Sequence, residues 1–292
     1  MNKVFKWAFL LLLLLFYQHV FAGLTKGIYI TQSTAEDTRF FKYLIGKSKA
    51  TGITTFIVDL ERPSKRYRDN VALLKENNIT YVARIIMFPD GGTHGQIMSK
   101  AIWEKKYALA QQAINWGATQ IQLDYIRYNT AQGASSEHAK NILRILQWFK
   151  SKLAAQNIPL QIDVFGITSF GEEKHIGQSI TLFSQSIDAL CPMLYPSHFE
   201  PYREHAKKPY ETVYKSIERI RAQFEGKKTP FKMYPYIELY NYRYALSHEQ
   251  KLNYIYAQIQ AAENSGANGW YVWNPFNDYE NLFHVLRTHK VQ

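Results

Sequence analysis

Short apolar segments with strand character alternate with amphipathic helical stretches along nearly the whole chain. The eight strand candidates are LTKGIYIT (24–31), TTFIVDLE (54–61), ITYVARIIMF (79–88), ATQIQLDYI (118–126), PLQIDVFGI (159–167), IDALCPMLY (187–195), FKMYPYIEL (231–239) and GANGWYVWN (266–274). Eight such units in about 270 residues predict an α/β fold, a single (β/α)8 barrel of the TIM type. A doubly wound open sheet is the alternative, but no glycine-rich phosphate loop follows the first strand.

The first 22 residues have the pattern of a secretory signal peptide. Lys3 and Lys6 precede the apolar run AFLLLLLLF, and VFA ends at Ala22 with small residues at the expected cleavage spacing. We therefore expect cleavage before Gly23, export to the periplasm or the medium, and one barrel domain over 23–292. An uncleaved anchor is the alternative, although the run is short for a comfortable membrane span.

Composition and charge restrict the choice of partners. The only cysteine, Cys191, lies in the apolar segment DALCPMLY, so we expect a small buried side chain and no internal disulfide. The formal net charge is +11, which is compatible with an anionic glycan, another anionic polymer or a membrane surface, but a generally basic soluble surface is the favoured interpretation. The basic residues are spread along the sequence and no nucleic-acid-binding module is present. We therefore expect no nucleic-acid partner.

Acidic side chains stand at the ends of several predicted strands. Because strand side chains alternate between two faces, Asp124 at the end of QIQLD lies opposite the isoleucine and leucine of that segment. The apolar face should meet the surrounding helices, which directs Asp124 into the barrel mouth, where (β/α)8 proteins carry their sites. The same alternation directs Asp59, Asp163 and Glu238 to this mouth.

Converging carboxylates suit the hydrolysis of glycosidic bonds. Burial and mutual repulsion separate their pKa values, so that one is protonated while another is ionised near neutral pH. Glycoside hydrolysis uses such a pair, one group protonating the leaving oxygen and the other attacking the sugar or activating water. We predict Asp124 as nucleophile or base, with Asp163 or Glu238 as the acid.

Purely structural roles for these acids are the alternative. Asp124 would then form an ion pair with Arg127, and Glu238 one with Arg243, while Asp163 would be held by a neighbouring backbone group or an arginine. Asp59 would cap the next helix or pair with a basic residue of the RPSK segment that follows it.

Aromatic and hydrogen-bonding side chains follow the same strand ends. Rings stack on sugar faces and polar groups bind hydroxyls, so these residues are candidates for a sugar site. The predicted substrate-binding residues are Asp59, Arg127, Tyr128, Tyr195, His198, Tyr236, Trp270 and Asn274. By alternation, Trp273 is expected behind its strand, outside the mouth.

Several of these motifs, in this order, resemble those of the putative glycosyl hydrolase domain family of bacterial exported proteins. They are LDYIRYN (123–129), DVFGIT (163–168), PMLYPSHF (192–199) and GWYVWNPFNDY (269–279), and KGIYIT (26–31) resembles the family's opening strand. The resemblance spans about 24–283 and implies a TIM-type barrel with a carbohydrate-active role. We expect no cofactor. The aspartates of the family's D-Y-I-R and D-V-F-G motifs fall on Asp124 and Asp163.

The seventh strand departs from the family pattern. Where the family commonly has P-W-L-Q-D-F, this chain has PYIELY, so Leu239 stands in the place of an aspartate and Glu238 is the candidate to replace it. The departure favours a second hypothesis, a carbohydrate-binding barrel without catalysis. A third is a metal-dependent hydrolase or deacetylase using Asp59, His94 or His198, although no H-x-H or H-E-x-x-H spacing is present.

Overall fold

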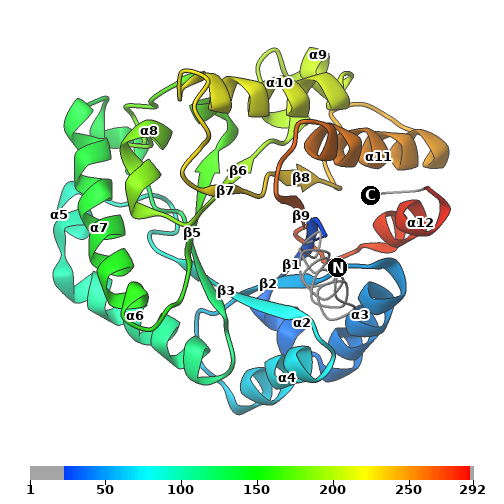
Figure 1. The fold of residues 1–292 in the computed structure, drawn as a ribbon, viewed down its shortest axis with the longest axis horizontal. Coiled ribbons are helices and arrows are strands. Elements are labelled where there is room, and N and C mark those ends of the chain that lie inside the picture. The colour runs from blue at the N-terminus through cyan, green and yellow to red at the C-terminus, as the bar shows by residue number, and fades with distance from the viewer. Residues whose placement is uncertain (1–22, 290–292) are drawn as a thin grey trace, which may run out of the picture.

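The computed structural model describes residues 23–289, which form a closed ring of parallel strands surrounded by helices (Figure 1). The ring has the order β5-β4-β3-β2-β1-β9-β8-β6, and pairing of β5 with β6 closes it. The strands are β1 (Thr25–Ile30), β2 (Thr55–Asp59), β3 (Thr80–Ile86), β4 (Gln120–Asp124), β5 (Leu160–Phe165), β6 (Ala189–Met193), β7 (Lys232–Met233), β8 (Tyr236–Glu238) and β9 (Gly269–Trp273). The predicted (β/α)8 barrel is confirmed.

The seventh barrel position is divided between two short strands. Both β7 and β8 pair with β6, and Pro235 lies between them without a backbone N–H to continue the ladder. Together they correspond to the single strand that the sequence predicted over 231–239.

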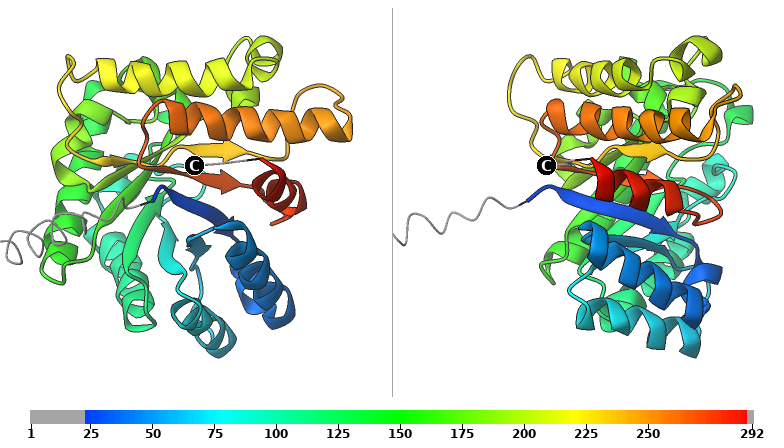
Figure 2. Two further views of the ribbon diagram at one scale, coloured as in Figure 1. Left: turned by 45° about the vertical axis from the view of Figure 1, so that its right-hand side comes forward. Right: turned by 90° about the vertical axis from the view of Figure 1, so that its right-hand side faces the viewer.

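Helices pack around the outside of the barrel and run alongside the strands (Figure 2). They are α2 (Gln32–Glu36), α3 (Thr38–Thr51), α4 (Lys65–Glu76), α5 (His94–Met98), α6 (Lys100–Asn115), α7 (Ser136–Ala154), α8 (Ile180–Phe183), α9 (Tyr202–Ala206), α10 (Pro209–Ala222), α11 (His248–Asn264) and α12 (Glu280–Thr288). Short 3-10 turns follow four strands or helices: η1 (Thr130–Gln132), η2 (Gly166–Phe170), η3 (Ser184–Ser186) and η4 (Pro196–His198). Ser247 precedes α11 as its N-cap and forms a capping box with Gln250.

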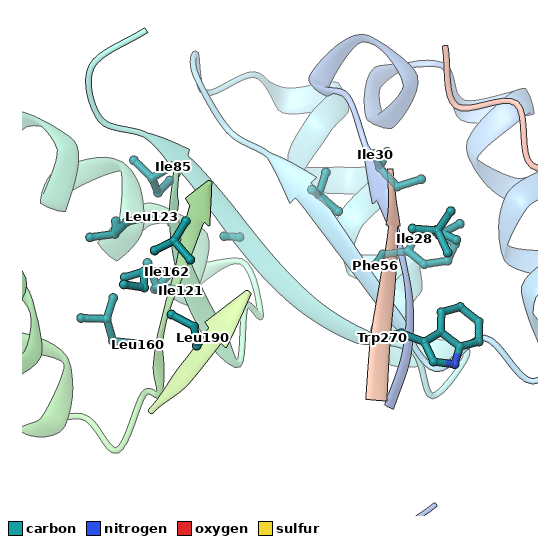
Figure 3. Close-up of a cluster of buried hydrophobic side chains, with 14 of the residues drawn as sticks. Ile28, Ile30, Phe56, Ile85, Ile121, Leu123, Leu160, Ile162, Leu190 and Trp270 are labelled. Atoms are coloured by element: carbon teal, nitrogen blue, oxygen red, sulfur yellow. The ribbon is translucent and has the colours of Figure 1, made fainter. Parts of the chain in front are cut away.

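Alternation along the strands produces two layers of buried side chains. The outward layer packs against the helices and includes Ile28, Phe56, Ile121, Leu123, Leu160, Ile162, Leu190 and Trp270 (Figure 3). The inward layer fills the barrel and includes Tyr29, Ile57, Val82, Cys191, Tyr236 and Tyr271. A (β/α)8 barrel is packed in this way and leaves its polar groups at the C-terminal ends of the strands. Cys191 is buried, as predicted.

Between residues 23 and 289, no helix is both long enough and apolar enough to cross a bilayer. The predicted signal peptide, residues 1–22, lies outside the described residues, so its cleavage and the export of the protein stay predictions.

Candidate active site

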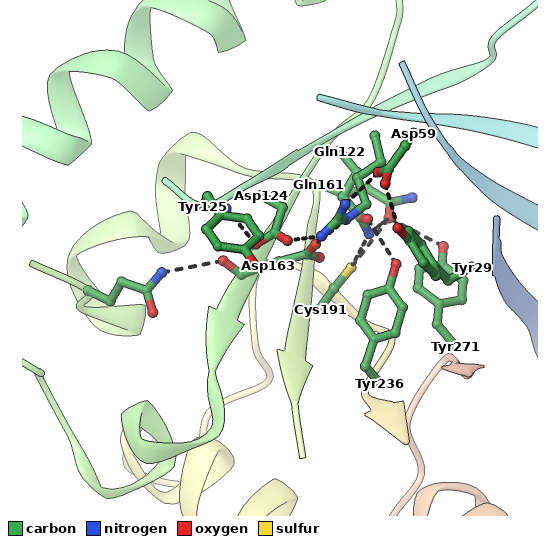
Figure 4. Close-up of polar contacts among 12 residues, drawn as sticks. Tyr29, Asp59, Gln122, Asp124, Tyr125, Gln161, Asp163, Cys191, Tyr236 and Tyr271 are labelled. Carbon is green, nitrogen blue, oxygen red and sulfur yellow. Dashed lines mark hydrogen bonds and ion pairs between the residues drawn. The ribbon is translucent and has the colours of Figure 1, made fainter. Parts of the chain in front are cut away.

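A buried arginine in β3, Arg84, occupies the centre of the barrel mouth. It shares the inward face of β3 with Val82, and its guanidinium binds carboxylates from three other strands. Nη1 donates to Asp59 and Nη2 to Asp124, while Nε donates to Asp163 Oδ2 at 3.2 Å. Figure 4 shows the three aspartates converging on one point. The strand alternation that predicted this convergence therefore holds for β2, β4 and β5.

One guanidinium cannot neutralise three buried carboxylates, so a proton is favoured on one of them. Burial raises the pKa of Asp163 to about 7; Arg84 opposes the rise and the charge of Asp59 adds to it. Asp163 Oδ2 accepts from Arg84, whereas Oδ1 is buried and has no hydrogen-bond partner among the described residues. A protonated Asp163 therefore carries its hydrogen on Oδ1, which donates to no acceptor among the described residues.

Asp124 has the opposite environment, in which both oxygens accept hydrogen bonds. Oδ2 accepts from Arg84, and Oδ1 accepts from the backbone N–H of Tyr125 at 2.5 Å. Tyr125 has φ +50°, a left-handed conformation that is uncommon for an aromatic residue and frequent at functional sites. These donors stabilise the ionised form of Asp124. The ion pair is formed with Arg84, and not with Arg127 as the structural alternative had it.

A cavity of about 580 Å³ lies over this cluster, with Arg84, Asp124 and Asp163 among its lining residues. Its walls are mainly aromatic and include Tyr125, Phe165, Phe170, Tyr195, Tyr202 and Trp273. Tyr195 and Trp273 are stacked, with ring centroids 5.3 Å apart and an interplanar angle of 18°. Carboxylates beneath such rings form a site in which a sugar ring can stack while its hydroxyls and glycosidic oxygen meet polar groups.

Three of the predicted substrate-binding residues line this cavity: Tyr195, His198 and Tyr236. The Tyr236 hydroxyl donates to Gln122 Oε1 at 2.9 Å, which fixes the ring against the barrel interior. Burial lowers the pKa of His198, and the nearby charge of Arg243 lowers it further. At neutral pH this imidazole is therefore a neutral hydrogen-bonding group.

The two tryptophans of β9 lie on the faces opposite to those predicted for them. Trp273 lines the cavity, because it shares the inward face with Tyr271. Trp270 is fully buried in the outward layer and donates through Nε1 to Glu263 at 3.0 Å, so it is not available to a sugar. Gly27 on β1 is the sequence feature that fits this orientation of β9. A Cβ at Gly27 would lie 2.5 Å from the inward ring of Tyr271, so the ring occupies the space that the glycine leaves.

Tyr128 and Arg127 also lie outside the cavity lining. Tyr128 is buried and stacked on His138, with ring centroids 3.7 Å apart, so it supports the loop after β4. The Arg127 guanidinium lies 5.7 Å from the ring centroid of Tyr125 and 5.4 Å from that of Phe165. Arg127 thus packs behind two rings of the cavity wall instead of reaching a ligand itself.

Asn274 and Asp59 have different neighbours from those expected. Asn274 donates to the carbonyl of Asp278 and accepts from the Phe276 N–H, so it shapes the loop after β9. Asp59 belongs to the Arg84 cluster and accepts from the Tyr29 hydroxyl at 2.5 Å. It does not line the main cavity, and it pairs with Arg84 rather than with a base of the RPSK segment.

Glu238 is not brought to the cavity, although the sequence placed it there as a candidate acid. Its Oε1 accepts from Ser197 N at 2.9 Å and from Tyr254 OH at 3.0 Å, and its Oε2 accepts from Ser197 Oγ at 2.7 Å. Burial raises the pKa of Glu238 to about 7, against the effect of the Ser197 hydrogen bonds. Arg243 binds the Ser197 carbonyl instead of Glu238. Glu238 therefore holds η4, the turn that carries His198.

Leu239 packs with the outward hydrophobic layer and is 7% exposed. Its side chain does not line the cavity, so the departure from the family pattern leaves the cavity wall intact in this chain.

The metal-dependent hypothesis finds no ligand set in the part of the chain that the structure describes. Within 23–289, no three His, Cys, Asp or Glu side chains are grouped so as to hold a metal ion. His94, one of the proposed ligands, contacts the Tyr128 hydroxyl through Nδ1 at 3.2 Å.

Solved structures with the same fold include several carbohydrate-active enzymes. The endo-beta-1,4-mannanase from Thermotoga petrophila has a TM-score of 0.66 at 12% identity, over 90% of this chain and 75% of that one. The Bacillus cereus spore cortex-lytic enzyme SleL has a TM-score of 0.65 at 12% identity, over 90% and 74%. A chitinase from Chromobacterium violaceum has a TM-score of 0.61 at 11% identity, over 92% and 100%. At such identities the likeness shows the fold alone.

A family model gives the more specific comparison, whereas no curated protein sequence matches the chain. The model described as putative glycosyl hydrolase domain matches residues 91–279, which is more than half of the chain. The match includes Asp124, Asp163 and the aromatic wall, and it begins after β3, so the opening strands that also resemble the family lie outside it. The chain belongs to the putative glycosyl hydrolase domain family.

Proposed function

We propose that this protein is a glycoside hydrolase in which Asp163 is the general acid and Asp124 is the ionised carboxylate that attacks the sugar or activates water. The observation that carries the proposal is the unpartnered Oδ1 of Asp163, a buried oxygen of a cavity-lining residue. A raised pKa keeps a proton on this group near neutral pH, as a leaving oxygen requires.

The hydrogen bonds around Arg84 give Asp124 and Asp163 different roles. It lies between Asp124 and Asp163 and binds both, but Asp124 has a second donor in the Tyr125 N–H. Hydrogen bonds to an ionised carboxylate favour that form, whereas burial without enough donors favours the protonated form. The unequal number of donors therefore supports Asp124 as the base or nucleophile and Asp163 as the acid.

The substrate that fits this cavity is a polysaccharide or an oligosaccharide. Tyr195 and Trp273 provide a stacked aromatic wall beside the acids, and aromatic rings bind the apolar faces of pyranoses. Proteins of similar fold include an endo-beta-1,4-mannanase, a spore cortex-lytic enzyme and a chitinase, so β-mannan, peptidoglycan and chitin are the first polymers to test. The signal-peptide pattern of residues 1–22 supports action after export, in the periplasm or the medium.

The proposal is tested by measuring new reducing ends in digests of these three polymers. We expect the unaltered protein to cleave at least one of them and Asp124→Asn to lose turnover while it keeps its fold and its affinity for the same glycan. Unchanged turnover in Asp124→Asn would remove this residue from the mechanism.

A carbohydrate-binding barrel is the second candidate, and one observation favours it. All three mouth aspartates are bound to Arg84, and both oxygens of Asp124 are occupied by donors in the ligand-free state. Such a site binds sugar hydroxyls without needing a free nucleophile. Binding of a glycan by the unaltered protein, with no cleavage of that glycan over days, would establish this second function instead.

A further inference from the structure

Basic side chains gather at the face of the barrel opposite the mouth, around the N-terminal ends of the strands. A cavity of about 880 Å³ lies there, and its wall carries Lys227, Lys228 and Lys232. Asp188 is the one carboxylate on this wall among the described residues, and it is already bound to Lys150 at 2.5 Å. The three lysines lie within six consecutive residues, 227–232, so this loop carries a local basic cluster that the overall spread of basic residues along the sequence conceals.

The three wall lysines have no ion-pair partner in the part of the chain that the structure describes. Lys227, Lys228 and Lys232 are all exposed, and their ammonium groups form no ion pair within residues 23–289. Neighbouring like charges repel one another, and an arrangement of this kind is relieved by an anionic partner.

Helix dipoles account for other charges on this face, but not for these three. The helices run antiparallel to the strands, so their C-terminal turns lie on this side; basic residues occur there at Lys49, Lys75, Lys152, Arg221 and Arg287. Bases at helix C-termini stabilise the helix itself. Lys227, Lys228 and Lys232 lie in the loop before β7 and at its first residue, where no helix dipole requires them.

The chain also enters the barrel beside this cavity. The Thr25 N–H, at the start of β1, donates to the carbonyl of Asn268, and Asn268 lines the cavity wall. In the right-hand view of Figure 2, the start of β1 and the loop before β7 lie on the same side of the barrel. The residues that precede β1 in the sequence contain the apolar run AFLLLLLLF. An uncleaved anchor, the alternative to cleavage before Gly23, would place the membrane on the side of the barrel where β1 begins; docking by the lysines does not require it.

We propose that this basic face, defined by Lys227, Lys228 and Lys232, docks on the anionic phospholipid surface of a membrane. Lysines close to such a surface are attracted by its negative potential, and each strengthens binding independently of any apolar insertion. Docking in this orientation directs the mouth of the barrel away from the bilayer, toward extended glycans.

Vesicle sedimentation tests the proposal without depending on enzymatic activity. The protein is the chain that begins at Gly23, because residues 23–289 contain the complete barrel and both of its buried layers. The vesicles contain phosphatidylglycerol and phosphatidylcholine at 3:7, or phosphatidylcholine alone. We expect binding only to the anionic vesicles, and loss of that binding in high salt because the attraction is screened.

A charge-reversal pair of variants locates the surface. Changing Lys227, Lys228 and Lys232 together to Glu should lower the partition coefficient by at least roughly 100-fold, since each lost lysine contributes about fivefold and the new carboxylates are repelled by the anionic surface as well. The matched control changes three exposed lysines on the mouth side to Glu, which alters net charge equally: Lys174, Lys207 and Lys208.

The two variants separate the possible outcomes. A large loss in the first variant and a small one in the control supports the proposal. Equal losses in both would show that net charge alone drives binding. Absence of binding to the anionic vesicles would show that these lysines do not dock on phospholipid. Either result overturns the proposal. Circular dichroism of both variants confirms that the fold is retained.

Discussion

Replacing Arg84 by methionine tests the electrostatic organisation of the barrel mouth. Methionine keeps most of the side-chain volume but removes the cation that Asp59, Asp124 and Asp163 share. Removing one partner of a buried ion pair typically costs about 3–5 kcal/mol, because the remaining charge stays buried without compensation. We therefore expect the free energy of unfolding to fall by about 3–5 kcal/mol at pH 7, a large part of the 5–15 kcal/mol typical of a domain.

The pH dependence of this loss identifies its cause. Without Arg84, burial favours the protonated forms of the three carboxyls, so the folded variant binds more protons than the unfolded chain does. The stability of Arg84→Met should therefore fall as the pH rises above about 4, the ordinary pKa of a free carboxyl, and recover when the pH is lowered. Urea unfolding monitored by tryptophan fluorescence at pH 5, 6, 7 and 8 gives the four free energies required.

A compensating variant controls for lost packing. Adding Asp59→Asn and Asp124→Asn to Arg84→Met removes two of the orphaned charges and should restore most of the lost stability at pH 7. A loss below about 1 kcal/mol for Arg84→Met, or a loss that is the same at pH 5 and pH 8, would contradict the assignment of Arg84 as the shared counter-ion.

Two further predictions concern the reaction and the cavity wall. The value of kcat/KM for a cleaved glycan should decline as the pH rises through about 7, because Asp163 then loses the proton that it donates. A kcat/KM that is constant between pH 6 and pH 8 would exclude Asp163 as the acid. Trp273→Ala should weaken glycan binding by about tenfold through the loss of a stacking surface. Trp270→Phe should instead lower the free energy of unfolding and leave glycan binding unchanged. Equal effects of the two substitutions on glycan affinity, measured by calorimetric titration, would contradict the assignment of Trp273 to the inward layer and Trp270 to the outward layer.

The barrel was predictable from the sequence because its signals are local. Strand alternation and helical periodicity are properties of short segments, and eight repeats of them leave few other folds. Alternation also placed Asp124 and Asp163 correctly at the mouth. Arg84 was missed because its role depends on three distant strands, although one charged residue inside the apolar segment ITYVARIIMF was a signal that buried acids would be needed near it.

The remaining differences come from contacts that short segments do not determine. Glu238 ends the three-residue strand β8, and its orientation is set by Ser197 from one loop and by Tyr254 from α11. Tyr128 and Asn274 follow the C-terminal ends of β4 and β9, as predicted, but their side chains stabilise loops and do not line the cavity. The paths of these loops depend on tertiary packing.

Comparison of Asp163→Asn with Glu238→Gln tests the central claim most directly. Both acids are buried and both have a pKa raised to about 7, but only Asp163 lines the cavity and has a free oxygen. On a glycan that the unaltered protein cleaves, we expect Asp163→Asn to lower kcat by about 10²–10⁴-fold and Glu238→Gln by less than about tenfold. Turnover that survives in Asp163→Asn and disappears in folded Glu238→Gln would contradict the account.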